Sequence, residues 1–168
     1  MLKYVNTGIV FQEIPDEVTL AINISNCPCH CPGCHSKQLW EDVGEPLTEE
    51  AIERMLASQP AGVSCVALMG GDACPAEVNA IASSLKAHHP KLKTAWYSGR
   101  STLSDRVSLD NLDYLKLGPY LAHLGSLKSP RTNQRFYRVE HSLAVGSAGK
   151  AQQSNRLQDL TPRFWKRP

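Results

Sequence analysis

The sequence predicts an α/β fold, specifically an open or partial parallel β/α barrel of about six strands. Segments with strand character alternate with segments of helical periodicity, an order typical of parallel strands joined by right-handed crossovers. The chain has 168 residues, whereas a closed α/β barrel typically needs about 250. Polar and sulfur-containing residues follow one predicted strand after another, at the edge where parallel α/β proteins bind their ligands.

The first predicted elements are a strand, a helix and a second strand. Apolar residues alternate over residues 18–24, as in a strand, and lead into a cysteine-rich loop. Thr48 is a suitable helix N-cap, because Glu49 and Glu50 follow it in the first turn and apolar residues then recur at helical spacing. Residues 63–69 are almost continuously apolar, as expected of a strand buried on both faces.

The second half of the predicted domain repeats this order. A helix begins at Pro75 and ends before Pro90, since proline favours a helix start and restricts the residue before it. Residues 92–97 form the next predicted core strand. A polar segment over residues 103–112 has a weak helical pattern and leads to a short strand at residues 114–117.

Composition is that of an ordinary globular protein, with 42% hydrophobic residues, 20% charged residues and a net charge of +2. No segment approaches the ~20 consecutive apolar residues that cross a bilayer. The first residues lack the apolar run of a secretory signal. We therefore expect a cytoplasmic protein that does not contact a membrane.

The charge is unevenly distributed along the chain. Residues 147–168 carry five basic side chains and one acidic side chain, and few of these residues are apolar. We expect one domain over residues 1–146, followed by a basic, loosely ordered C-terminal tail over residues 147–168. A solvated tail or a protein-docking arm is favoured over a nucleic-acid contact, so nucleic acid is not an expected partner.

Four of the six cysteines lie within residues 27–34. Cysteines at this density, in a chain without a secretory signal, favour metal binding or catalysis over disulfides. The spacing Cys27-x-x-x-Cys31-x-x-Cys34 offers three thiolates to a [4Fe–4S] cluster, which normally takes four, so one iron stays open to another ligand. Cys29 is then a spare thiol. The alternative is a zinc site made by all four cysteines, but zinc sites are usually built from two Cys-x-x-Cys pairs some distance apart.

Two further motifs follow predicted strands. In Gly70-Gly71-Asp72, the missing Cβ atoms allow close approach of a ligand. Free backbone carbonyls and the Asp72 carboxylate would then bind the ammonium group of that ligand. The same residues also suit an ordinary strand-to-helix connection. Ser98 follows the next predicted strand. Lys116 lies in an otherwise apolar strand. Its ammonium group either pairs with a carboxylate of the protein, extends to solvent or binds the carboxylate of a ligand.

Together these motifs resemble the radical S-adenosylmethionine (SAM) superfamily and, within it, the activating proteins of anaerobic (class III) ribonucleotide reductases. The resemblance covers residues 6–140. It rests on the segments Cys27–His35, Gly70–Asp72, Lys116–Tyr120 and Thr132–Arg135. The extra thiol of Cys29 and the histidine at position 35 depart from the usual pattern of these proteins.

The resemblance implies a radical SAM barrel in which Cys27, Cys31 and Cys34 hold a [4Fe–4S] cluster and SAM binds the fourth iron. Reductive cleavage of SAM would give methionine and a 5′-deoxyadenosyl radical, which takes a hydrogen from a backbone glycine of the reductase. The protein would then be an oxidoreductase similar to the activating enzyme of formate C-acetyltransferase, with no catalytic side chain of its own. An external donor such as a flavodoxin-type protein would supply the electron. The residues expected to bind SAM are Gly70, Gly71, Asp72, Ser98 and Lys116.

Two other functions fit the same motifs. Within the radical SAM superfamily, the alternatives are activation of another glycyl radical enzyme and modification of a small molecule. From a different class, a zinc-stabilised binding module would use the basic tail for nucleic acid. The short chain offers no insertion to enclose a small substrate, which favours a protein substrate.

Overall fold

The computed structural model describes residues 1–59, 62–145 and 151–165. Its strands are β1 (Lys3–Val10), β2 (Thr19–Ile24), β3 (Glu45–Pro46), β4 (Cys65–Met69), β5 (Lys93–Tyr97), β6 (Tyr114–Leu117), β7 (Arg135–Val145) and β8 (Ala151–Asp159). Its α-helices are α1 (Glu49–Ser58) and α2 (Pro75–His88), and its short 3-10 helices are η1 (Lys37–Leu39), η2 (Leu109–Asn111) and η3 (Thr161–Phe164). Within the described residues, no helix combines the length and the apolar content needed to cross a bilayer.

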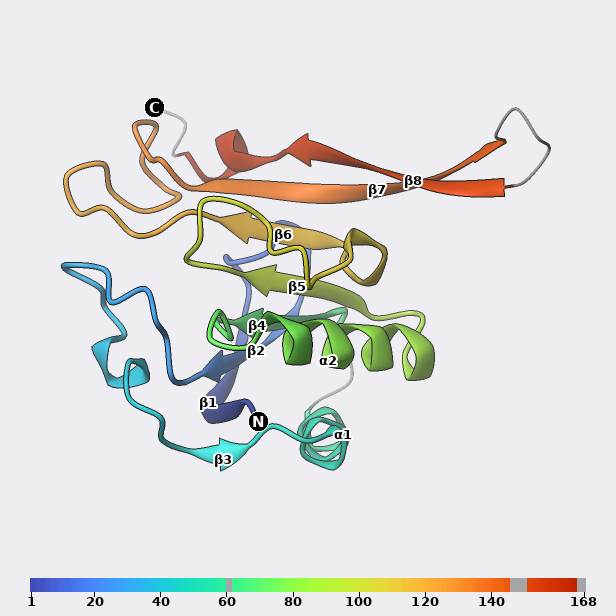
Figure 1. The fold of residues 1–168 in the computed structure, drawn as a ribbon, viewed down its shortest axis with the longest axis horizontal. Coiled ribbons are helices and arrows are strands. Elements are labelled where there is room, and N and C mark those ends of the chain that lie inside the picture. The colour runs from blue at the N-terminus through green and yellow to red at the C-terminus, as the bar shows by residue number, and fades with distance from the viewer. Residues whose placement is uncertain (60–61, 146–150, 166–168) are drawn as a thin grey trace.

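All the described strands belong to one mixed sheet with the order β3-β1-β2-β4-β5-β6-β7-β8 (Figure 1). The four predicted strands, β2, β4, β5 and β6, are parallel neighbours at its centre. In one row across them, Leu68 pairs with Ile22 on one side and Trp96 on the other, and Trp96 pairs with Leu115. Antiparallel strands flank this centre on both sides. The carboxyl ends of the parallel strands therefore meet at one edge.

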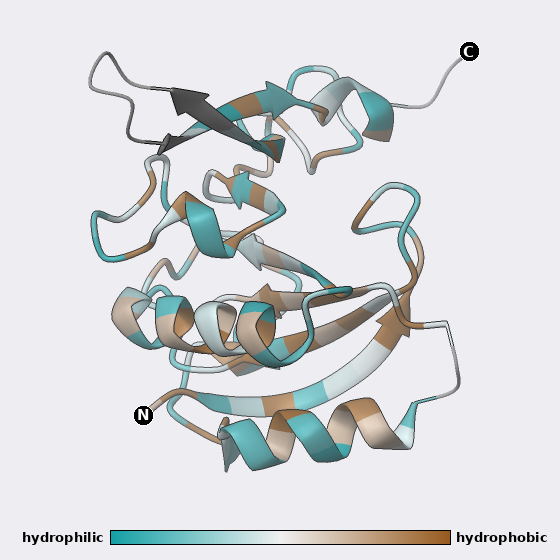
Figure 2. Cartoon of the chain, turned by 90° about the vertical axis from the view of Figure 1, so that its right-hand side faces the viewer, coloured by the Kyte–Doolittle hydropathy of each residue, from teal (hydrophilic) through white to brown (hydrophobic). Residues whose placement is uncertain are grey.

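The larger core lies between the sheet and the two α-helices, and the strands in the middle of the domain are its most apolar segments (Figure 2). Thr48 caps α1 as predicted, because its Oγ1 accepts a hydrogen bond from the backbone N–H of Ala51 at 3.2 Å. The helix α2 begins at Pro75 as predicted. The core includes Leu20, Ile22, Ile24, Ile52, Met55, Val66, Leu68, Val78, Ile81, Leu85, Trp96 and Leu115.

A second, smaller core covers the opposite face of the sheet. The alanines at positions 67 and 95 leave room there for Ile14, which comes from the β1–β2 connection and is fully buried. Phe164 of η3 packs on the same cluster, with its ring centroid 5.0 Å from that of Phe136. Two segments distant in sequence therefore close this face of the sheet.

The prediction of a loosely ordered tail is wrong for residues 151–165. Strand β8 pairs antiparallel with β7, in register from Tyr137 opposite Asp159 to Ser142 opposite Ser154. The backbone N–H of Phe136 then donates to Oγ1 of Thr161 at 2.9 Å. A polar segment can form this edge strand because its pairing uses backbone groups, whereas the prediction relied on apolar side chains. Residues 147–150 and 166–168 of the predicted tail lie outside the described residues.

Two other predictions differ in detail. The weak helical pattern over residues 103–112 produces only the short 3-10 helix η2. The described sheet also has more strands than the predicted six or so, because the first residues form β1 and the C-terminal half adds a hairpin. Neither addition disturbs the order of the central parallel strands.

Candidate functional site

A cavity of about 200 Å³ lies at the carboxyl ends of the parallel strands. Its lining comes from the cysteine loop after β2, the turns after β4 and β5, and β6, and it also includes Trp40, Tyr120 and Gln134. Most of the residues predicted for the site line this one cavity: Cys27, Cys31, Cys34, Gly70, Asp72, Ser98 and Lys116. Cys29 also lines it, as does Gly99, which the sequence analysis did not assign to the site.

The cysteine loop folds back on itself as soon as it leaves β2. Left-handed backbone conformations at Asn26, His30 and Gly33 turn it. The N–H of Cys27 donates to the carbonyl of Leu39 at 2.9 Å, which fixes the start of the loop against η1. All four thiols of the loop are free. Within the described residues, no three His, Cys, Asp or Glu side chains converge closely enough to hold a single metal ion.

Cys29 differs from the other cysteines of the loop. Burial, and after it the charge of the nearby Asp72 carboxylate, raises the pKa of its thiol to about 12. Its Sγ atom lies against the backbone of Gly99, where an added Cβ would be only 2.5 Å away. The thiol of Cys29 therefore keeps its proton at neutral pH in the metal-free protein. That Cys29 is a spare thiol stays a prediction.

Asp72 is bound by the protein itself. It is 6% exposed. One carboxylate oxygen, Oδ1, accepts a hydrogen bond from Oγ of Ser98 at 2.5 Å, and the other, Oδ2, accepts one from the N–H of Gly99 at 2.9 Å. The carboxylate thus links the turn after β4 to the turn after β5. Its hydrogen bonds hold these two turns together at the wall of the cavity.

Lys116 is also buried and bound to backbone groups. Its Nζ donates to the carbonyl of Ser98 at 3.3 Å and to the carbonyl of Gly118 at 2.5 Å. Burial lowers the pKa of its ammonium group to about 8, while the Asp72 carboxylate opposes that shift. Gln134 shares the Gly118 carbonyl at 3.4 Å. The ammonium group can donate a third hydrogen bond, to a ligand in the cavity.

The two glycines after β4 have different surroundings. Gly70 lines the cavity, and its carbonyl accepts a hydrogen bond from the indole nitrogen of Trp96 at 2.8 Å. Gly71 does not line it. A Cβ on Gly71 would lie 2.6 Å from Cγ2 of Val78, so this glycine faces the buried side of α2. Both have positive φ, which favours glycine. The glycine at position 71 is therefore explained by close packing of the turn against α2. A contact of Gly71 with a ligand stays a prediction.

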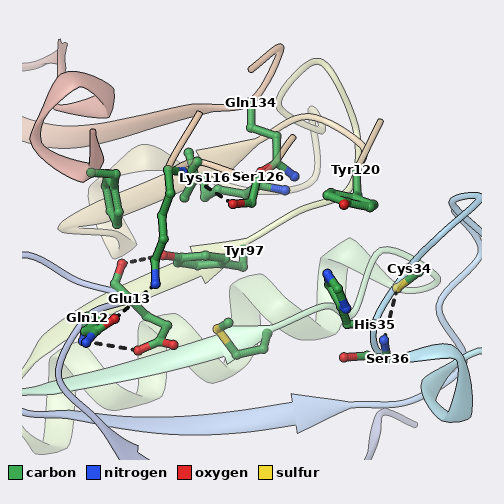
Figure 3. Close-up of a pocket in the computed structure, with 14 residues that line it drawn as sticks. Gln12, Glu13, Cys34, His35, Ser36, Tyr97, Lys116, Tyr120, Ser126 and Gln134 are labelled. Atoms are coloured by element: carbon green, nitrogen blue, oxygen red, sulfur yellow. Dashed lines mark hydrogen bonds between the residues drawn. The ribbon is translucent and has the colours of Figure 1, made fainter. Parts of the chain in front are cut away.

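Figure 3 shows the lining of a second cavity, which has a volume of about 410 Å³. The two cavities share several lining residues, among them Cys34, Tyr97, Lys116 and Tyr120. Figure 3 shows His35 and Tyr120 on the side of Cys34, with Gln12 and Glu13 of the β1–β2 connection on the opposite side. The sequence analysis missed Tyr97 and Gln12, because no local pattern marks them as site residues.

Comparison with protein families identifies the metal centre. A family model described as a 4Fe–4S single cluster domain matches residues 17–129, which include every predicted site residue. The chain belongs to this family. It is therefore an iron–sulfur protein, and the zinc alternative loses its support. No curated protein and no solved structure matches the chain.

The residues at the site fit the cluster that this 4Fe–4S family implies. Iron–sulfur clusters are held by cysteine thiolates, and free cysteines from one loop line the cavity. The N–H of Ser36 donates a hydrogen bond to Sγ of Cys34 at 3.3 Å. Cys31 is itself buried, so a cluster bound there would be shielded from water on that side.

Proposed function

We propose that this iron–sulfur protein is a radical SAM enzyme and the activating protein of an anaerobic (class III) ribonucleotide reductase. One observation carries the proposal. The free cysteines share a cavity with a glycine turn and with a buried lysine that has a hydrogen bond to spare. Such a site suits a cofactor with an amino and a carboxylate group bound beside a cluster. We also propose that the sheet is a partial barrel of the radical SAM type.

The three cysteines of the Cys-x-x-x-Cys-x-x-Cys pattern, Cys27, Cys31 and Cys34, would hold the cluster. When bound, the cluster supplies the electron that cleaves SAM to methionine and a 5′-deoxyadenosyl radical. Lys116 would bind the SAM carboxylate, and the backbone of Gly70 would border its amino group. Asp72 and Ser98 would support these contacts from behind, since they already bind each other.

The second cavity supports a protein substrate. At about 410 Å³ it is larger than the first cavity, and Cys34 lines it. Its lining includes Met69, Tyr97 and Leu127, which offer apolar contacts to a polypeptide segment. We propose that a glycine-bearing segment of the reductase enters here, that an external one-electron donor of the flavodoxin type reduces the cluster, and that the reaction takes place in the cytoplasm.

The test is an anaerobic reaction of the reconstituted protein with SAM, a strong reductant and its cognate class III reductase. We expect 5′-deoxyadenosine in the solution and a carbon-centred doublet on the reductase by electron paramagnetic resonance (EPR). Cleavage of SAM without the doublet would contradict the activase assignment and leave another glycyl radical enzyme or a small molecule as substrate. Absence of SAM cleavage by a fully loaded protein would contradict the radical SAM assignment itself.

A further inference from the structure

Trp40 contributes an unpaired hydrogen-bond donor beside the cysteine-lined cavity. The residue lines that cavity, and its Nε1 atom is buried without a hydrogen-bond partner among the described residues. A buried N–H without an acceptor costs about 1–3 kcal/mol, and few such groups persist in folded proteins. The position of this one suggests that its acceptor is a group that binds in the cavity.

The indole ring is held in place by its neighbours. The His30 ring stacks on it, with 4.8 Å between ring centroids and 12° between ring planes. Lys37 places its Nζ 5.8 Å from the ring centroid. The backbone on either side is tied to the start of the cysteine loop, because Leu39 accepts from Cys27 and Glu41 accepts from Asn26. Reorientation of the ring toward solvent would break the stacking contact.

Two acceptors in the wall of the cavity already have donors within the protein. The Asp72 carboxylate accepts hydrogen bonds from Ser98 and Gly99. The carbonyl of Gly70 accepts from the indole of Trp96. A [4Fe–4S] cluster would bring new acceptors, its sulfides and the thiolates that bind it, and hydrogen bonds to these sulfurs are one of the factors that set cluster potentials.

We propose that the Nε1–H group of Trp40 donates a hydrogen bond to a sulfur of the [4Fe–4S] cluster, either a sulfide or a ligand thiolate, and so raises the reduction potential of the cluster. The direction follows from charge, because the reduced cluster is the more negative state and a donor stabilises it more. Trp40 is then a tuning residue for electron uptake. The inference rests on the cluster and not on SAM chemistry, so it stands apart from the proposed function.

The test compares Trp40→Phe with Trp165→Phe in the reconstituted protein. Trp165 has the other buried indole nitrogen without a partner in the described part of the chain, but it lines neither cavity. We expect Trp40→Phe to keep the cluster and to shift its midpoint potential downward in an EPR-monitored redox titration, and Trp165→Phe to leave the potential unchanged. A loaded Trp40→Phe protein with the wild-type potential would overturn the proposal, as would equal shifts in the two variants.

A second measurement decides the question if Trp40→Phe does not retain iron. Wild-type protein grown with tryptophan labelled with ¹⁵N in the indole ring is reduced and examined by pulsed EPR. We expect a ¹⁵N coupling and an exchangeable proton coupling from a hydrogen bond to the cluster, and Trp96 is not expected to contribute because its N–H is bound to Gly70. Absence of both couplings in the loaded wild-type protein would overturn the proposal.

Discussion

Ser98 donates its hydroxyl hydrogen to Oδ1 of Asp72 over 2.5 Å and joins the turn after β5 to the turn after β4. The carbonyl of Ser98 accepts from the Lys116 ammonium group. A negative and a positive side chain, both buried, are thus connected through one residue at the wall of the cavity. These hydrogen bonds give Asp72 a structural role in the wall of the cavity.

Replacing Asp72 with Ala should lower the free energy of unfolding by about 1–3 kcal/mol, because it leaves the Ser98 hydroxyl and the Gly99 N–H without their acceptor. Asp72→Asn should cost less, since the amide retains one acceptor and can donate to the hydroxyl. Urea denaturation measures both. If Asp72→Ala were as stable as wild type but bound SAM more weakly by calorimetry, Asp72 would contact the ligand and not hold the two turns together.

Lys116 should give the stability of the metal-free protein a defined pH dependence. Its pKa is about 8 in the fold and 10.5 in the unfolded chain, because burial disfavours the charge. Between these values the unfolded state binds more protons, so the free energy of unfolding should rise with pH, by up to about 3 kcal/mol. Below pH 8 the buried ammonium group is charged, so its burial lowers the free energy of unfolding by the full amount.

The matched variant is Lys116→Met, which keeps the volume and removes the titrating group. The difference in unfolding free energy between wild type and this variant should change in favour of wild type from pH 8 to pH 10.5. A difference that stays constant across this range would show that the folded lysine titrates like an exposed one. Groups that titrate in this range without interacting with Lys116 contribute equally to both proteins and cancel.

The cysteine assignment predicts the iron content of single variants. Cys27→Ala, Cys31→Ala and Cys34→Ala should each lose most of the cluster after anaerobic reconstitution, while Cys29→Ala should keep it. Cys74→Ala is the control, because Cys74 is also free but lines neither cavity. Iron and sulfide analysis measures the outcome. A Cys29→Ala protein as empty as the other three would make Cys29 a ligand.

Gly99 allows a steric test of the same loop. Unlike Gly70 it has no positive φ, so alanine is tolerated by the backbone, but the new Cβ would lie 2.5 Å from Sγ of Cys29. Gly99→Ala should therefore displace the cysteine loop and reduce iron content. Adding Cys29→Ala should restore part of it, because the closest contact is then gone. No recovery in the double variant would mean that Gly99 acts through another neighbour.

The sequence predicted the parts of the fold that depend on local chemistry. The cap of α1 by Thr48 needs only a hydroxyl and the following turn, and the buried strand β4 needs only a continuous apolar run. Strand β8 was missed because its pairing with β7 is made by backbone groups that leave no pattern in the side chains. Ile14 shows the same limit, since only the fold reveals that a residue in a polar connection fills a core.

The candidate site was predictable to the same degree. The cysteine spacing, the position of Ser98 after one parallel strand and that of Lys116 near the end of the next were sufficient to predict that these residues lie at one edge of the sheet, where they line one cavity. The different surroundings of Gly70 and Gly71 could not be predicted, because two neighbouring residues of a turn face opposite sides of it. Trp40 was missed because a single aromatic residue after a loop has no periodic partner, and its unpaired N–H is visible only in three dimensions.

The C-terminal segment packs on the smaller core. Phe164 packs edge-on against Phe136, which is fully buried, and the backbone of Phe136 is bound to Thr161 in the same segment. Phe164→Ala should therefore lower the free energy of unfolding by about 2 kcal/mol, less than the 3–5 expected for a completely buried phenylalanine. Arg163→Ala is the control, since its ion pair with Asp16 is exposed and should contribute little.

Because of these contacts, deletion of the basic C-terminal segment should affect the stability of the fold as well as partner binding. Removing residues 151–168 takes away β8 and η3 together, so we expect a lower thermal midpoint and a joint loss of iron binding and partner binding. A docking arm without a structural role would behave differently, because its removal would weaken partner binding while the thermal midpoint stayed unchanged. Since Phe164 also lines the larger cavity, the segment helps to shape the space where a protein substrate would enter.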